Sequence, residues 1–473
     1  MENKNIDVNK VDASVKIAKR AYKTKYEDLP ASVVEKTKYG ILDLIGVMFA
    51  ATTLGQRAPE MVEYEKSRGG VEEATVFGCG YKLPLEHAIT ANGYLAHSLD
   101  LDDYNSIAGT HHTASNFTTA MGVFEKEGKG TGKDMITAVA IGNDLNLRLG
   151  YSVPQADGFG ILGPMCMSVF SSAITAAKAM GLTEDQFIQT LAFANLFECG
   201  IGQCLHESGT QARELYQGFA QRQGIYAAIM ASKGITCSIN SFEGVGGLYK
   251  VFFGQPGMHE PKYLDVDNDY DTWYGDFSCF KMWCSCGITQ PAVTCAKIIK
   301  EKYHIDYKDI AEIRIGVGNH GWMLSHPEEA KQFPKNANDG KFSVQYALCN
   351  FLVKDDVSVL DFSEEARHDP RVLALTPLCE MVYVDEYAAV QSSVQPSWVE
   401  ITMKDGKVYT EQRNYPLGDY RDPFDMQEVV KKFRRNCKFS KHPMSDEKVE
   451  RIIEICTNLE NYDNLTELAS LLA

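Results

Sequence analysis

Segments with helical periodicity fill most of the first 260 or so residues, and this pattern limits the fold more than any other feature of the chain. The sequence Pro30-Ala31 predicts the start of one helix, after which Val34 and Ile41 begin a series of apolar residues at helical spacing. Further helices are predicted at Glu86–Leu99, Met135–Leu149, Cys166–Met180, Glu184–Phe197 and Gly218–Lys233. These segments are rich in alanine and glycine, which suits close packing of helix against helix. The chain is therefore predicted to be mainly α.

The pattern changes after about Pro261. The segment Ile310–Val317 alternates in the manner of a half-buried strand, and Trp398–Tyr409 predicts a hairpin that turns at Asp405-Gly406. Helices are predicted between these strands, at Gln290–Tyr303 and Ser343–Val353. Helical periodicity returns at Met426 and continues to the end. We therefore expect a large helical domain formed by both chain ends (residues 1–265 and 421–473), with a smaller α/β domain inserted at residues 266–420.

Charge and composition exclude several classes of partner. The net charge of −16 argues against general binding to nucleic acid or to anionic membranes, but a local group of cations can still hold a small anion. No apolar stretch reaches 18 residues, since the best candidate, Ile41–Ala51, is short and contains Asp43. The polar N-terminus and the 13 cysteines predict a cytoplasmic protein with reduced thiols. We expect the cysteines to be packing residues, because the spacing of Cys279, Cys284 and Cys286 fits no common metal site.

The densest group of polar residues is His97, Asp100, Asp102 and Asp103, followed by His111-His112. Three carboxylates so close together repel one another and are costly to bury without partners. Histidines about ten residues later can return across a loop, and a carboxylate that orients an imidazole makes a general base. Two other interpretations stay open, namely a solvated acidic turn with surface histidines and a site for a divalent metal ion.

Two cations are candidates for binding a carboxylate. Arg213 lies in a glycine-bounded segment that opens a helix, where a cation and a helix N-terminus together suit an anion. Lys281 lies between Phe280 and Met282, so it either extends its charge to solvent or is held in a site. Taken alone, an arginine in such a position is more often a surface residue. The motifs of nucleotide, flavin, zinc-protease and serine-hydrolase sites are not found in the sequence.

The segment Ala91–Asp103, with the sequence ANGYLAHSLDLDD, closely resembles the N-G-x-x-A-H-x-L-D-x-D-D signature of the MmgE/PrpD family. Weaker similarity continues through Gly209–Ala220, Lys281–Pro291 and Lys341–Tyr346, so the resemblance covers nearly the whole chain. It implies a helical domain made from both chain ends, an inserted α/β lid domain and an active site between the two. It also implies a homodimer that needs neither an organic cofactor nor a metal ion.

The resemblance also implies roles for single residues. Asp100 matches a site aspartate of the family, Lys281 matches its lid lysine, and the catalytic histidine falls on His111, with His112 as the other choice. Three positions differ from the family pattern: Arg213 replaces a lysine, and Gly160 and Gln290 each replace a histidine. We expect Arg213 and Gln290 to bind substrate, and His206 to be a candidate replacement for a missing imidazole.

These residues predict a cofactor-independent lyase that acts on a small di- or tricarboxylate, as a hydratase/dehydratase or a decarboxylase. In this hypothesis His111, oriented by Asp100, moves a proton next to a carboxylate, and Arg213 and Lys281 hold the carboxylates. The first alternative is an isomerase or epimerase of an amino- or imino-dicarboxylate. The second is a relative that binds a metabolite without turnover, because a fold does not fix a function.

Overall fold

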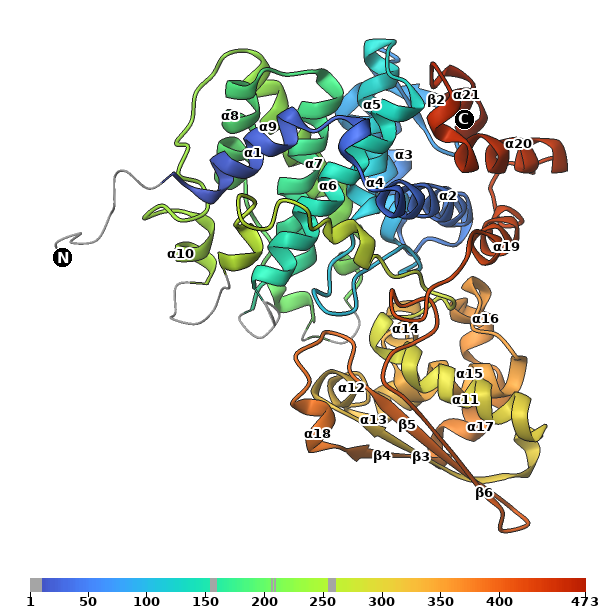
Figure 1. The fold of residues 1–473 in the computed structure, drawn as a ribbon. Helices are drawn as coiled ribbons and strands as arrows, with labels where there is room; N and C mark the ends of the chain where they lie inside the picture. Colours follow the sequence, from blue (N-terminus) through green and yellow to red (C-terminus); the bar gives the residue numbers. More distant parts are fainter. Residues whose placement is uncertain (1–10, 154–159, 206, 208–209, 254–260) are drawn as a thin grey trace.

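The computed structural model describes residues 11–153, 160–205, 207, 210–253 and 261–473. It is mainly helical, with 60% of the chain in helices and 8% in strands, as the periodicity predicts. Two parts are visible in Figure 1, a larger helical part above and a smaller α/β part below.

The helical part places α2 at its centre. This helix is buried from Tyr39 to Thr52 with hardly an interruption, so it has neighbours on every side rather than one apolar stripe. It contacts helices from both ends of the chain, because α4, α5 and α6 precede the α/β part and α19 and α20 follow it. The helices of the first part are α1 (Ala13–Lys23), α2 (Ala31–Leu54), α3 (Ala58–Ser67), α4 (Leu85–His97), α5 (Thr113–Glu127), α6 (Gly132–Ser152), α7 (Gly163–Met180), α8 (Glu184–Leu196), α9 (Tyr216–Ser232) and α10 (Leu248–Phe252).

These boundaries agree with the helices predicted from periodicity to within a few residues. Gly181 ends α7 in the left-handed conformation (φ 71°), which a glycine adopts without the steric cost of a Cβ atom. A short hairpin of β1 (Ala74–Val76) and β2 (Tyr81–Leu83) lies beside α4.

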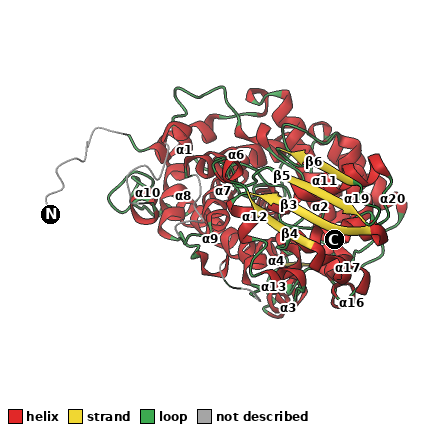
Figure 2. Ribbon diagram, turned by 90° about the horizontal axis from the view of Figure 1, so that it is seen from below, coloured by secondary structure: helices red, strands yellow, loops and turns green. Residues whose placement is uncertain are grey.

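The α/β part contains a mixed sheet of four strands in the order β4-β3-β5-β6. The strands are β3 (Ile310–Val317), β4 (Cys379–Tyr383), β5 (Ser397–Met403) and β6 (Val408–Arg413). The predicted strand at Ile310–Val317 is confirmed, and so is the hairpin, whose turn places Gly406 at φ 87°. Only β3 and β4 run parallel, and the view from below shows the sheet in front of the helices (Figure 2).

The helices of the α/β part are α11 (Gln290–Tyr303), α12 (Asn319–Met323), α13 (Glu328–Gln332), α14 (Ala337–Lys341), α15 (Val344–Lys354), α16 (Glu364–Arg367), α17 (Pro370–Leu375) and α18 (Asp385–Ala388). The long helix α11 packs against β5 and β6, and α15 packs against α11. Their apolar faces give the sheet a core of its own, which explains why the sequence changes its pattern in this part.

The last helices return to the helical part. They are α19 (Met426–Cys437), α20 (Asp446–Thr457) and α21 (Thr466–Leu472). In α19, Lys432 reaches Asp43 of α2 at 2.8 Å and also donates to the backbone carbonyl of Leu101 at 2.8 Å. The contacts of Lys432 therefore show that the chain returns to the helical part after the α/β part. The domain limits at residues 265 and 420 stay a prediction.

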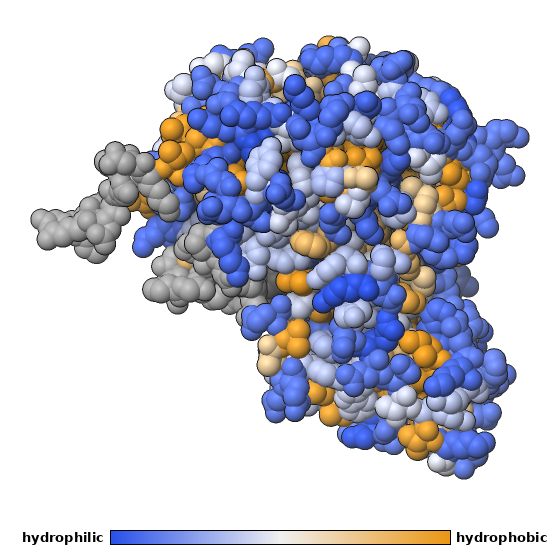
Figure 3. Space-filling view, viewed as in Figure 1, coloured by the Kyte–Doolittle hydropathy of each residue, from blue (hydrophilic) through white to orange (hydrophobic). Residues whose placement is uncertain are grey.

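Among the described residues, no single helix is long and apolar enough to cross a bilayer, although α2 and α3, bent by 87°, pass a test of length and composition together. On the face seen in Figure 3, hydrophilic residues predominate and hydrophobic residues form separate patches. All 13 cysteines lie in the described part and carry free thiols.

Candidate active site

A cavity of about 430 Å³ lies between the helical part and the α/β part. Chemically active side chains line it from three segments: the loop after α4, the turn before α9, and the α/β part with the segment that leads into it. They include Asp100, His111, Arg213, Lys281, His320 and Lys331. The structure therefore brings together four of the residues singled out from the sequence, Asp100, His111, Arg213 and Lys281, and adds two others.

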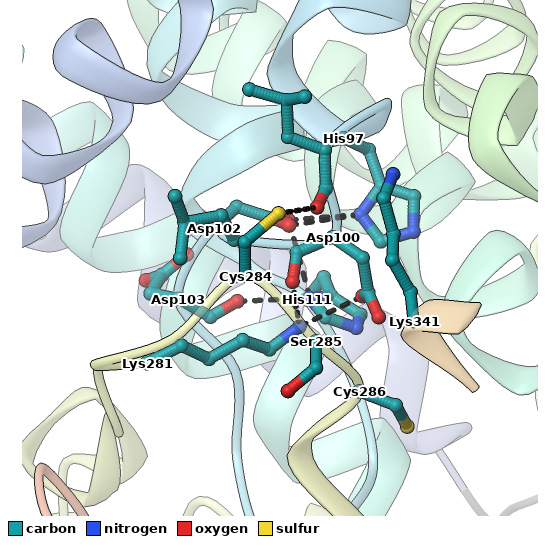
Figure 4. A network of polar contacts seen from close by, with 12 residues as sticks. His97, Asp100, Asp102, Asp103, His111, Lys281, Cys284, Ser285, Cys286 and Lys341 are labelled. Atoms are coloured by element: carbon teal, nitrogen blue, oxygen red, sulfur yellow. Dashed lines mark hydrogen bonds and ion pairs between the residues drawn. The ribbon is translucent and has the colours of Figure 1, made fainter. Parts of the chain in front are cut away.

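The loop after α4 is joined to a segment some 180 residues later. Tyr104 and Cys279 form an antiparallel bridge in which each backbone N–H donates to the other's carbonyl, at 2.9 and 2.7 Å. This bridge brings Lys281 to Asp100, where its ammonium group donates to both the backbone carbonyl and Oδ1 at 2.7 Å (Figure 4). The Asp100–Lys281 pair is almost completely buried.

Asp100 has an unusual backbone conformation, with φ at 51°. Aspartate tolerates the left-handed region better than most residues, but the conformation still costs about 1 kcal/mol or more. It lets the chain reverse directly after His97 and presents the backbone carbonyl and Oδ1 of Asp100 to Lys281. Burial opposes ionisation of this carboxyl, but Lys281 and then Arg213 outweigh it and hold its pKa well below the usual range.

Asp102, rather than Asp100, orients the imidazole of His111. The Nδ1 atom of His111 lies 3.2 Å from Asp102 Oδ2 and 3.0 Å from the backbone carbonyl of Asp103. The same carboxylate contacts Nδ1 of His97 at 3.0 Å. The prediction that Asp100 orients His111 is therefore wrong, because Asp100 is taken up by Lys281 on the other side of the loop.

The hydrogen bonds assign a tautomer to His111. Both neighbours of its Nδ1 are acceptors, so the hydrogen of the neutral ring is on Nδ1 and the lone pair is on Nε2. Burial lowers the pKa of His111, although Asp102 opposes this, and the pKa of Asp102 itself is held well below its usual range by His97 and His111 despite its burial. A neutral imidazole beside a charged carboxylate can accept a proton from a molecule in the cavity.

His112 does not line the cavity and contacts buried polar groups instead. Its Nε2 atom lies 2.7 Å from Ser278 Oγ and 2.9 Å from Asp103 Oδ2, and the side chain is fully buried. Asp103 also accepts a hydrogen bond from Thr113 Oγ1 at the start of α5. Asp103 and His112 thus fix the loop that carries His111, and the geometry favours His111 over His112 as the proton carrier.

Arg213 offers unsatisfied donors near Asp100. It lies in a short 3₁₀ turn, Ala212–Leu215, with its guanidinium over the ring of Phe342 at 4.2 Å and its Nη1 3.9 Å from Asp100 Oδ1. Its Nε and Nη1 atoms are buried and have no hydrogen-bond partner among the described residues. Nε and Nη1 lie on different edges of the guanidinium, so each is free to donate to an oxygen of an anion in the cavity.

The neighbouring residue Glu214 anchors this turn. Its carboxylate contacts Lys341 Nζ at 2.9 Å, and Lys341 also donates to the backbone carbonyl of Ser98 at 2.9 Å. Burial raises the pKa of Glu214 to about 7, and Lys341 opposes this only in part. The pair joins the turn of Arg213, the end of α4 and the end of α14 at one point (Figure 4 shows Lys341).

Two other residues expected at the site are placed differently. Gln290 begins α11, is fully buried, and donates from Nε2 to the backbone carbonyls of Trp283 and Ser285 at 2.9 and 3.1 Å. It does not line the cavity, so the structure contradicts its assignment to substrate binding; it fixes the segment just after Lys281 instead. His206 lies outside the described residues.

The alternative of a metal site can be compared with this geometry. Ligand atoms of His97, Asp100, Asp102 and His111 lie within 4.8 Å of one another. However, Oδ1 of Asp100 already binds the ammonium group of Lys281, and both oxygens of Asp102 contact histidine nitrogens. A divalent ion would have to share this space with a buried cation, so the donor set fits a metal poorly.

Two residues at the α/β side of the cavity were missed in the sequence. His320 lies three residues after the end of β3. Lys331 lies next to Phe342, and its ammonium group donates to the backbone carbonyl of Phe342 at 2.7 Å. Burial lowers the pKa of Lys331. Neither residue lies in a motif, and the only signal was the position of His320 just beyond a predicted strand.

Comparison with known proteins finds matches along almost the whole chain. Residues 15–261 match the MmgE/PrpD N-terminal domain, and residues 283–461 match the MmgE/PrpD C-terminal domain. A cis-aconitate decarboxylase of Aspergillus terreus is 26% identical over 471 residues, covering 94% of this chain and 93% of that protein. The human cis-aconitate decarboxylase is 24% identical, covering 95% and 92%. A mitochondrial 2-methylcitrate dehydratase of Yarrowia lipolytica is 25% identical, covering 53% and 49%.

Proposed function

Because this chain belongs to the MmgE/PrpD family, we propose that it is a lyase that acts on a small di- or tricarboxylate. The reaction is a proton transfer at a carbon next to a carboxylate, followed or preceded by loss of water or of carbon dioxide. The observation that carries the proposal is the pairing of a neutral His111, oriented by Asp102, with the unsatisfied guanidinium of Arg213 in one cavity.

The residues divide the chemistry between them. Arg213 binds a substrate carboxylate and, with Lys281, stabilises the negative charge that develops on it when the neighbouring carbon loses a proton. His111 exchanges that proton through Nε2, and Asp102 stabilises the imidazolium that forms. Asp100 holds the ammonium group of Lys281 in place next to the reacting atoms.

The relatives support the class of substrate. They are named for reactions of tricarboxylates, a decarboxylation of cis-aconitate and a dehydration of 2-methylcitrate. The cations Arg213 and Lys281 in the cavity of this chain suit a substrate with several carboxylates of this kind. Within this proposal the α/β part is the lid domain, the enzyme is a cytoplasmic homodimer, and turnover needs no organic cofactor and no metal ion.

A second candidate is an isomerase or epimerase of an amino- or imino-dicarboxylate. It is favoured by two carboxylates, Glu207 and Asp339, that line the same cavity and would balance the charge of an amino group. This reaction uses the same first step, removal of the proton by His111.

Incubation of the protein with citrate, methylcitrate, cis-aconitate and aspartate-like acids in heavy water tests the proposal. A lyase forms an unsaturated acid or releases carbon dioxide, whereas an epimerase incorporates deuterium into substrate without net loss. Prior dialysis against EDTA leaves either rate unchanged. Binding without any exchange or turnover of these acids would refute the proposal and favour a non-catalytic metabolite-binding protein.

A further inference from the structure

His320 is the imidazole that the sequence motifs did not indicate. It lies in α12, and it lines the main cavity together with Asp100 and His111. Among the residues that the structure describes, the cavity is lined by three histidines, His111, His320 and His326. The positions at which the family pattern has further histidines are occupied here by Gly160 and Gln290.

The hydrogen bonds of His320 give it the same tautomer as His111. Its Nδ1 atom lies 2.8 Å from the backbone carbonyl of Ser393, an acceptor only, so Nδ1 carries a hydrogen. Its backbone N–H donates to Gln395 Oε1 at 3.1 Å. The ring is therefore held from one side, and Nε2 is the nitrogen left to exchange a proton with a molecule in the cavity.

The segment that holds His320 is bound to the loop that carries His111. The backbone N–H of Ser393 donates to Ile107 at 3.1 Å, and that of Val394 donates to Ser106 at 2.7 Å. Gly109 has φ at 67° and packs so closely on Ser393 that an added Cβ would lie 2.8 Å from its Oγ. The two histidines come from different parts of the molecule, yet one short backbone contact fixes them relative to each other.

His326 is placed differently and provides a comparison. Its ring stacks on Trp322 with centroids 4.0 Å apart, and Nδ1 lies 3.0 Å from the carbonyl of that residue. Its Nε2 lies 4.0 Å from Glu328, whose side chain is more than half exposed. Nε2 of His326 thus faces a solvated carboxylate, whereas Nε2 of His320 has no polar partner within the part of the chain that the structure describes.

We propose that His320 is a second catalytic residue, the general acid that protonates the leaving hydroxyl group, and that the substrate is a hydroxy-polycarboxylate that loses water. This inference rests on the proposed function and makes it more specific. A dehydration moves protons at two atoms, carbon and oxygen, whereas a decarboxylation needs only one proton, delivered to carbon. Two imidazoles in one cavity, each held through its own Nδ1, match the first reaction.

His111 Nε2 takes the proton from the carbon next to the carboxylate, and the electron pair of that C–H bond forms the C=C bond. The C–O bond breaks, its electron pair stays with the oxygen, and the oxygen takes a proton from Nε2 of protonated His320 and leaves as water. Exchange with solvent then returns a proton to His320 and removes one from His111.

A pair of leaving groups tests the assignment. Fluoride needs little help from an acid, so the fluoro analogue of the hydroxy acid bypasses a general acid but still requires the base. His320→Asn keeps the donor to Ser393 and removes Nε2; it should slow loss of water by about 10²–10⁴-fold and loss of fluoride by less than about tenfold. The control is His368→Asn, at an exposed histidine outside the cavity whose Nδ1 also lies next to a backbone carbonyl; it should change both rates little. His111→Asn should slow both.

The ratio of the rate of water loss to the rate of fluoride loss does not depend on how much of a variant is folded. The same ratio measured for His320→Gln gives a second, independent test of the role of Nε2. Equal losses on both leaving groups, or no loss on either, would overturn the assignment. If the wild-type enzyme decarboxylates cis-aconitate but dehydrates no hydroxy acid, the role of His320 is refuted while that of His111 stands. If no polycarboxylate reacts at all, the proposed function itself fails.

Discussion

The cavity has two walls that are built in different ways: an inner wall formed by the loop that carries Asp100 and His111, and an α/β wall that carries His320 and Lys331. At the inner wall, Asp100 and Asp102 are buried and charged, and each contacts two or more cationic or imidazole groups. At the α/β wall, His320 and Lys331 are held mainly by one hydrogen bond each from the side chain to a backbone carbonyl. The inner wall is therefore costly to disturb, whereas the α/β wall can change at little cost to folding. In the proposed function, the inner wall is the one that fixes the position of the reacting carbon.

The largest expected effect is the loss of the proton carrier at the inner wall. His111→Asn keeps a donor near the position of Nδ1 but has no basic nitrogen at Nε2, so kcat should fall about 10²–10⁴-fold while the fold is retained. Steady-state rates and a thermal melt measure the two quantities. His112→Asn is the matched control: it should lower stability through Ser278 and Asp103 and leave kcat of the folded enzyme within a few fold. The reverse result would assign proton transfer to His112.

The second effect concerns the buried ion pair. Lys281→Met leaves the carboxylate of Asp100 buried without its main partner, which should cost about 3–5 kcal/mol of unfolding free energy. Adding Asp100→Asn removes the unpaired charge and should recover part of this loss, so the two changes should not be additive. Chemical denaturation of the wild type, both single variants and the double variant gives the coupling energy.

The same pair has a pH signature. The pKa of Asp100 lies well below its ordinary value, so its contribution to stability is fully present above that ordinary value and is lost as the pH falls below it. The double variant should lack this acid-side loss. Additive changes in stability, or identical acid profiles, would show that the Asp100–Lys281 contact does not stabilise the fold.

The comparison also explains what could be predicted from the sequence. Helices and the β5–β6 hairpin depend on local periodicity and turn residues, so most of them were predicted to within a few residues. The signature around His97 and Asp100 indicated the inner wall, because its residues are close together in the chain. That Asp102 rather than Asp100 orients His111 depends on the left-handed conformation of Asp100, which spacing alone does not reveal.

The α/β wall could not be predicted in the same way. His320 and Lys331 are isolated in sequence, and they reach the cavity only through long-range contacts such as the one between Ser393 and Ile107. Gln290 illustrates the opposite error, since it stands where the family pattern has a histidine yet is buried against the carbonyls of Trp283 and Ser285. Chain position predicted a role for it that its hydrogen bonds exclude.

A smaller effect, on the pH dependence of the unfolding free energy, is expected at the buried pair of Glu214 and Lys341. Burial raises the pKa of Glu214 from 4.5 to about 7, so between these values the folded protein binds a proton that the unfolded chain has lost. The contribution of this group to stability therefore falls as the pH rises from about 4.5 to about 7, by roughly 1–3 kcal/mol. Glu214→Gln has no such titration, so its stability relative to the wild type should increase over this range. A constant difference between the two proteins would contradict the raised pKa.

The smallest effect is expected at the α/β wall, and it separates binding from chemistry. Lys331 and Arg213 both contact Phe342, one at its backbone carbonyl and the other over its ring, so they are placed to bind two carboxylates of one substrate. A charge-assisted hydrogen bond at this half-buried position contributes about 1.5 kcal/mol, so Lys331→Gln should raise KM about tenfold and change kcat little. Lys335→Gln, an exposed residue of the same segment, is the control. A large loss of kcat in Lys331→Gln alone would show that the α/β wall acts on the transition state, and the contrast between a catalytic inner wall and an adaptable outer one would no longer hold.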